Sequence, residues 1–92
     1  MTESSRRADP ASRRVIDVAI GILMGLRRCS ERDAFDDLVR AVHETGVGPA
    51  ALATALADIV AGEGDRGGRH TEATLMWGHL LVARAPSVNV AE

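Results

Sequence analysis

The sequence predicts an all-α fold, in which a small three-helix bundle is followed by a fourth helix. Four segments of the 92-residue chain carry apolar residues at the spacing of amphipathic helices, and no segment alternates as a half-buried strand would. Phe35 and Trp77 are the only aromatic residues. Ala, Val, Leu and Ile must therefore supply most of the core, which favours helix–helix packing over a sheet.

The first predicted helix starts at residue 11 or 12 and ends at residue 27 or 28. Asp9 or Ser12 can cap its start, while Arg27 and Arg28 complement the dipole at its end. Residues 15–26 are apolar on nearly all sides of this helix, which is more than one face of a small core requires. The surplus surface should be covered by a partner subunit or by the fourth helix.

The second predicted helix spans residues 31–45. Ser30 and Asp33 resemble a capping box at its start. Its apolar stripe includes Phe35 and Leu38, both expected in the core. The opposite, solvent-facing side carries the charged residues Asp33, Asp36, Asp37 and Arg40.

Glycine and proline mark the remaining boundaries. Gly46 can end the second helix in the left-handed conformation, and Pro49 suits the first turn of a third helix over 49–61, whose stripe ends in Ile59 and Val60. The predicted organisation is a disordered tail over 1–10, a three-helix domain over 11–62, a glycine-rich linker over 63–70, an amphipathic helix over 71–85 and a tail over 86–92.

The sequence offers no constellation for catalysis. His43, His70 and His79 lie on three different segments without paired cysteines, so no metal site is predicted. Cys29 is expected to be a small residue in a helix–helix turn rather than a nucleophile. No enzyme activity, cofactor or small-molecule substrate is therefore expected. The single cysteine, the lack of a signal peptide and an apolar run too short for a bilayer predict a cytoplasmic chain without a membrane segment.

Charge is distributed unevenly along the chain. Residues 1–30 contain six arginines and three acidic residues, whereas residues 31–63 contain two arginines and seven acidic residues. All basic residues except histidine are arginines, whose planar guanidinium can bind a phosphate through two parallel hydrogen bonds. The net charge of −2 argues against general nucleic-acid binding, and the chain has a basic front and an acidic middle.

Three stretches, "ASRRVIDVAIGILM", "CSERDAFDDL" and "ETGVGPAALATALADIV", resemble the ANTAR domain. This is the three-helix RNA-binding output module of bacterial antiterminators. The resemblance covers about residues 11–60 without a gap and indicates a stand-alone ANTAR unit. The residues that match the family pattern are Ser12, Arg13, Ile16, Ala19, Gly21, Ile22, Leu23, Met24, Ser30, Ala34, Phe35, Leu38, Thr45 and Ala53.

The resemblance implies an RNA-binding antitermination regulator that recognises hairpin RNA through basic residues. Some positions that are usually polar or basic in the family differ here: Ile20 stands for a lysine, Leu26 for a residue that is often basic, and Gly46, Val47 and Gly48 for a polar, basic turn. Each lost cation removes a phosphate contact. The arginines left to bind RNA are Arg13, Arg14, Arg27, Arg28 and Arg40.

The same departures support an alternative, an ANTAR-derived dimerisation or protein-interaction module that does not bind RNA. The first helix of the family commonly pairs two subunits, so the partner would be a second copy or another ANTAR regulator. If the fourth helix covers the surplus apolar surface instead, the chain would be monomeric. The residues expected at a partner interface are Val15, Val18, Ile20, Ile22 and Leu26.

Overall fold

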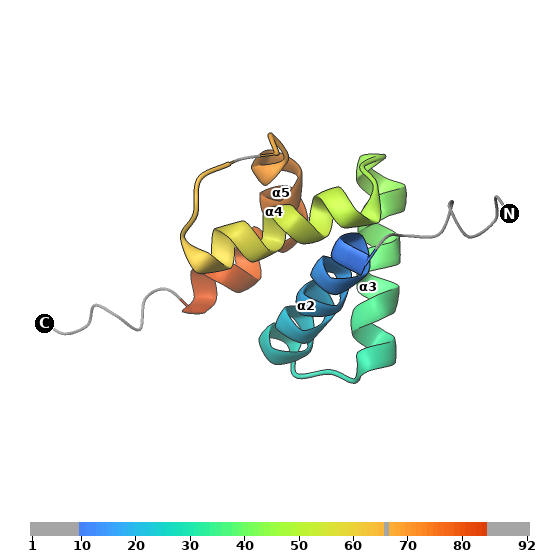
Figure 1. Cartoon of the computed structure of the whole chain (residues 1–92). Helices are drawn as coiled ribbons and strands as arrows, with labels where there is room; N and C mark the ends of the chain where they lie inside the picture. Colours follow the sequence, from blue (N-terminus) through green and yellow to red (C-terminus); the bar gives the residue numbers. More distant parts are fainter. Residues whose placement is uncertain (1–9, 66, 85–92) are drawn as a thin grey trace, which may run out of the picture.

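The computed structural model describes residues 10–65 and 67–84, which form four helices and no strand (Figure 1). The helices are α2 (Pro10–Arg27), α3 (Glu31–Thr45), α4 (Pro49–Ala61) and α5 (His70–Arg84). The all-α prediction is confirmed. Pro10 opens α2 instead of ending the predicted tail. Residues 1–9 of the first predicted tail, Ala85 at the end of the last predicted helix and the predicted tail over 86–92 lie outside the described residues.

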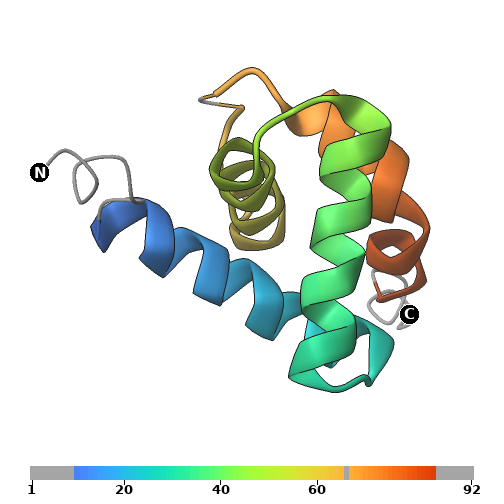
Figure 2. The same ribbon diagram turned by 90° about the vertical axis from the view of Figure 1, so that its right-hand side faces the viewer.

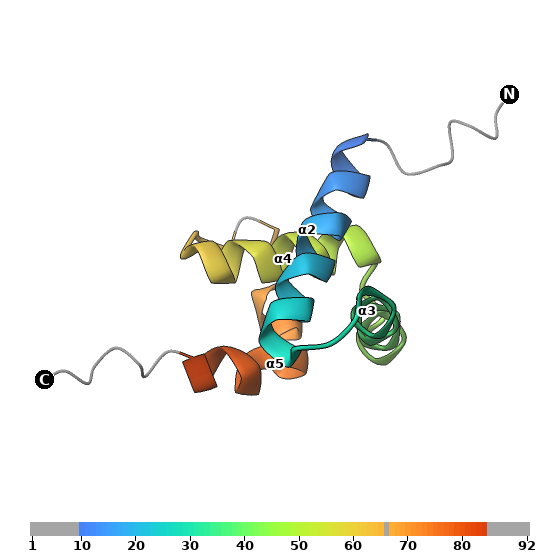
Figure 3. The same ribbon diagram turned by 90° about the horizontal axis from the view of Figure 1, so that it is seen from below.

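The first three helices pack around a small core, and α2 contributes fully buried residues to it. In Figure 3, α2 crosses α4 at a steep angle, while α3 is seen nearly end-on beside them. Ala19 and Leu23 of α2 are fully buried, and the small side chain of Ala19 permits close approach of the helices. The other residues of these helices that are at most 3% exposed are Ala34, Leu38, Ala41, Leu52, Ala53, Ala55 and Leu56.

Helix α5 completes the same core. In Figure 2, α4 is seen nearly end-on, with the start of α2 on one side of it and α5 on the other. Ala73 and Trp77 of α5 are fully buried, and Trp77 is the largest fully buried side chain described. Helix α5 packs mainly on α4 and touches α2 only slightly. It therefore covers part of the apolar surface of the bundle and leaves much of α2 uncovered.

Local signals place the helix ends as predicted. The Ser30 side chain accepts a hydrogen bond from the Asp33 backbone N–H at 3.1 Å, and Gly46 ends α3 with a φ of 75°. Thr45 Oγ1 accepts from the Val47 N–H at 3.1 Å and donates to the Ala41 carbonyl at 2.8 Å. These bonds fix the turn into α4, where Pro49 takes the first helical position.

Two predictions about the orientation of α3 are wrong. Asp37 is only 7% exposed and does not face solvent, whereas Phe35 is 48% exposed and lies outside the core. The buried stripe of α3 is formed by Ala34, Asp37, Leu38 and Ala41. Because these residues face the core, Phe35 lies at the edge of the buried face of α3. Asp37 can be buried because other helices supply partners for its carboxylate.

In the part of the chain that the structure describes, none of the four helices is both long enough and apolar enough to cross a bilayer.

Candidate nucleic-acid interface

The buried carboxylate of Asp37 joins three helices. Arg27 Nε of α2 donates to Asp37 Oδ2 at 2.7 Å, and Trp77 Nε1 of α5 donates to the same oxygen at 3.1 Å. Arg40 Nη2, one turn further along α3, donates to Asp37 Oδ1 at 3.3 Å. Three donors, two of them charged, satisfy the carboxylate, which makes its burial tolerable.

This cluster changes the role expected of two arginines that are predicted to bind RNA. The side chains of Arg27 and Arg40 are 30% and 59% exposed, so both reach the surface while they also pair with Asp37. They line a hollow of about 350 Å³ together with Asp36 and Asp37. Two carboxylates thus stand against two guanidinium groups, and a phosphate placed there would gain little net attraction.

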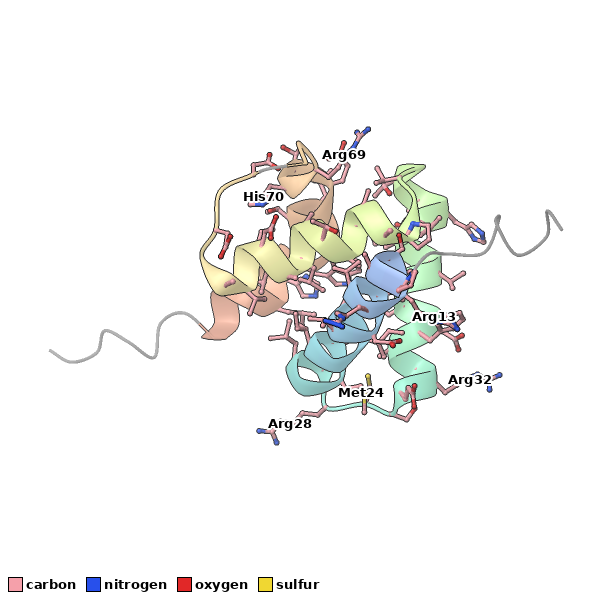
Figure 4. The ribbon with its side chains drawn as sticks, viewed as in Figure 1. Arg13, Met24, Arg28, Arg32, Arg69 and His70 are labelled. Atoms are coloured by element: carbon pink, nitrogen blue, oxygen red, sulfur yellow. The ribbon has the colours of Figure 1, made fainter. Side chains whose placement is uncertain are left out.

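The other three predicted arginines differ from this pair. Arg13, Arg14 and Arg28 are exposed, and none of them pairs with a carboxylate within residues 10–65 and 67–84. In Figure 4, Arg13 points to the side on which α3 lies, whereas Arg28 points away on the other side of α2. Their full charge remains available to a ligand.

Arg28 also occupies an unusual backbone position. Its φ of 55° lies in the left-handed region, which L-residues other than glycine seldom adopt. The Cys29 N–H next to it donates to the Met24 carbonyl at 3.2 Å and closes the end of α2. The Cys29 thiol lies 3.9 Å from the Leu23 carbonyl oxygen as a donor, which fits the predicted place of Cys29 in a helix–helix turn.

An apolar surface extends over α2 and α4. Val18 and Val60 are 47% and 49% exposed there. Arg14, Val15 and Val18 line a hollow with Ala57, and Ile22 and Leu26 line a second one with Gly21, Gly25 and Val60. Four of the five residues predicted at a partner interface thus share this surface.

Ile20, the fifth, lies on a different face of α2. It is almost fully buried, so it offers little area to a partner subunit. Together with Glu31, Arg32 and Phe35 it lines a hollow of about 320 Å³ between α2 and the start of α3. Sequence reasoning missed this hollow because Phe35 fits the helical spacing of a core residue, and no local signal distinguishes an edge position from a core position.

The polar residues between α4 and α5 have a structural role. Asp65 Oδ1 accepts from the backbone N–H groups of Arg69 and His70 at 3.1 and 3.3 Å, which caps the start of α5. Arg69 and His70 are labelled in Figure 4 at this end of the molecule. No group of three or more histidine, cysteine or acidic residues that could hold a metal ion occurs in the described part of the chain.

Comparison with known proteins gives one result. The family model described as the ANTAR domain matches residues 5–56 of the chain. No curated protein and no solved structure is significantly similar to it. The match ends within α4, so α5 lies outside it.

Proposed function

Because this chain belongs to the ANTAR domain family, we propose that it binds hairpin RNA and acts as a transcription antitermination regulator. The observation that carries the proposal is the family match over residues 5–56, which is more than half of the chain. The exposed arginines that pair with no carboxylate among the described residues support it, because phosphate contacts supply a large share of the affinity for nucleic acid.

The proposed RNA surface follows α2. Arg13 and Arg14 lie near its start and Arg28 at its end, separated by about 22 Å at 1.5 Å per residue. Phosphates in different parts of one hairpin can occupy these positions. Arg27 and Arg40 would contribute less, because Asp37 and Asp36 offset their charge.

The test is a binding titration with an RNA that carries two hairpins with six-nucleotide loops, compared with a scrambled-loop control at two salt concentrations. We expect selective binding that weakens as salt rises, because bound counterions are released. Failure to bind at moderate salt by a chain shown to be folded would overturn the proposal.

Replacing Arg13 and Arg14 by glutamine should reduce the salt dependence of binding. Each lost phosphate contact lowers the slope of log affinity against log salt by about 1, so the double variant should lose about 2. Arg69→Gln is the matched control, since Arg69 is also partly exposed but lies outside the family match and pairs with Glu72. An unchanged slope in the double variant would remove both residues from the interface.

The apolar surface of α2 and α4 favours a second candidate function, association of two copies of this chain. Gly21 and Gly25 lie one turn apart there, and a Cβ atom built on either would meet no other atom. The fold of one chain therefore does not require glycine at these helical positions, although each glycine costs about 1 kcal/mol relative to alanine. Close approach of a second α2 would explain them.

This candidate predicts opposite effects on folding and association. Gly21→Ala with Gly25→Ala should raise the free energy of unfolding of the dilute chain by about 1–2 kcal/mol. The same change should weaken self-association, because added methyl groups separate the two helices. Sedimentation equilibrium and urea denaturation measure the two quantities. A variant that is more stable and associates as the parent chain does would exclude close α2 pairing.

A further inference from the structure

We propose that the hollow formed by Ile20, Glu31, Arg32 and Phe35 binds one unpaired nucleobase of the RNA loop, with Phe35 as the stacking surface. The inference rests on the proposed RNA-binding function and adds to it a residue that contacts a base rather than a phosphate. It commits to a base that carries an exocyclic amino group. The argument uses the exposure of Phe35, the chemistry of its neighbours and the size of the hollow.

Phe35 presents an aromatic surface where the fold does not need one. It is 48% exposed, although phenylalanine is among the residues most often buried. The core of α3 is instead formed by Ala34, Leu38 and Ala41. Proteins that read single-stranded loops commonly stack bases on aromatic side chains, because every base has a flat π-face.

The neighbours of Phe35 match the parts of a nucleotide. Ile20 supplies an apolar wall from α2, and the Arg32 side chain, which is highly exposed, can reach a phosphate beside the base. Arg32 Nε lies 3.9 Å from Asp36 Oδ2, a distance too long for a hydrogen bond, so this exposed pair does not hold the guanidinium firmly.

Glu31 gives the hollow a preference among bases. A carboxylate accepts hydrogen bonds and donates none when ionised, so it suits an exocyclic amino group of adenine, cytosine or guanine. Uracil has no exocyclic amino group and presents carbonyl oxygens at the corresponding positions, so it would be disfavoured. Glu31 also repels phosphate, which leaves the Arg32 side of the hollow for the RNA backbone.

Size and position favour a base over a protein partner. The hollow measures about 320 Å³, close to the lower end of small-ligand pockets. Arg13 precedes Ile20 by two turns of α2, so both lie on one face of that helix. In Figure 4, Arg13 and Arg32 point to the same side of the molecule.

The test is a double-mutant cycle between protein and RNA. The protein forms are the parent chain, Phe35→Leu and Phe35→Tyr, and the RNA forms carry an abasic site at each loop position in turn. Phe35→Leu keeps an apolar side chain but removes the π-face, so it should bind about tenfold more weakly. Phe35→Tyr should bind as the parent chain does.

The cycle should also identify the base. One abasic position should weaken binding by the parent chain about as much as Phe35→Leu does, and the two changes together should cost no more than either alone. Uracil at that position should bind more weakly than a base with an amino group. Circular dichroism checks that each variant is folded.

The outcomes separate the two proposals. If the parent chain binds the RNA selectively and Phe35→Leu binds equally well, the base site is excluded and RNA binding stands. If every abasic position costs the same with both proteins, Phe35 does not contact a base. A change in self-association without a change in RNA affinity would make the hollow a protein contact. If the parent chain binds no RNA, both proposals fail together.

Discussion

Replacing Trp77 by alanine is expected to lower the free energy of unfolding by about 4–5 kcal/mol. Trp77 is fully buried, and its removal leaves a cavity between α5 and the first three helices. It also removes the indole N–H that donates to Asp37 at 3.1 Å. A small domain has a total stability of only about 5–15 kcal/mol, so much of this variant should be unfolded at physiological temperature. Urea denaturation followed by circular dichroism measures the loss.

Two further variants separate packing from hydrogen bonding in this prediction. Trp77→Phe keeps an aromatic ring but lacks the N–H donor, and should lose about 2 kcal/mol. Leu75→Ala is the matched control on the same helix, because Leu75 is the most exposed large apolar residue described, and its stability should change by less than about 0.5 kcal/mol. If Trp77→Ala unfolds at the same urea concentration as the parent chain, α5 is not part of the cooperative core.

Replacing Asp37 by asparagine should lower the free energy of unfolding by about 2–3 kcal/mol. The carboxylate accepts from Arg27, Arg40 and Trp77, whereas an amide has a single acceptor oxygen and would turn an N–H₂ group toward a donor. The expected loss is smaller than for a fully buried pair, because water reaches both guanidinium groups. Thermal and urea unfolding of the variant measure it.

Asp36→Asn is the matched control for this prediction. Asp36 is the neighbouring carboxylate on α3 but is exposed, so its replacement should change stability by less than about 0.5 kcal/mol. Asp37→Asn should also bind RNA more tightly at low salt, because Arg27 and Arg40 would no longer face its negative charge. If Asp37→Asn neither loses stability nor gains RNA affinity, the cluster neither stabilises the fold nor weakens RNA binding.

The helix positions could be predicted from the sequence because their signals are local. Each of these signals affects residues close to it in the chain. Ser30 caps a helix, Gly46 adopts a left-handed turn, and Pro49 has a fixed φ. The rotation of α3 about its axis has no such local signal. Asp37 is buried because of Trp77, which lies 40 positions further along the chain and on a helix outside the family match.

The residues of the candidate site also separate into those whose surroundings the sequence could predict and those whose surroundings it could not. Arg13, Arg14 and Arg28 are predicted to bind RNA, and the structure leaves them exposed and paired with no carboxylate of the described residues. Arg27 and Arg40 could not be set apart from them by sequence, because their partner Asp37 fitted a solvent-facing pattern equally well. The predictions for Ile20 and Phe35 are wrong for the same reason. Ile20 is expected at a partner interface but is buried, whereas Phe35 is expected in the core but is exposed. Spacing alone does not decide which side of an apolar stripe faces the core.

The indole of Trp77 is a built-in optical probe of this molecule. The chain contains one tryptophan and no tyrosine, so its near-ultraviolet emission originates from a single residue. That residue is enclosed between α5 and the bundle and touches the carboxylate that also holds Arg27. Its emission maximum should shift to longer wavelength when α5 separates, and can be excited where RNA absorbs little. A titration can therefore follow helix docking and ligand binding in one cuvette without any attached dye.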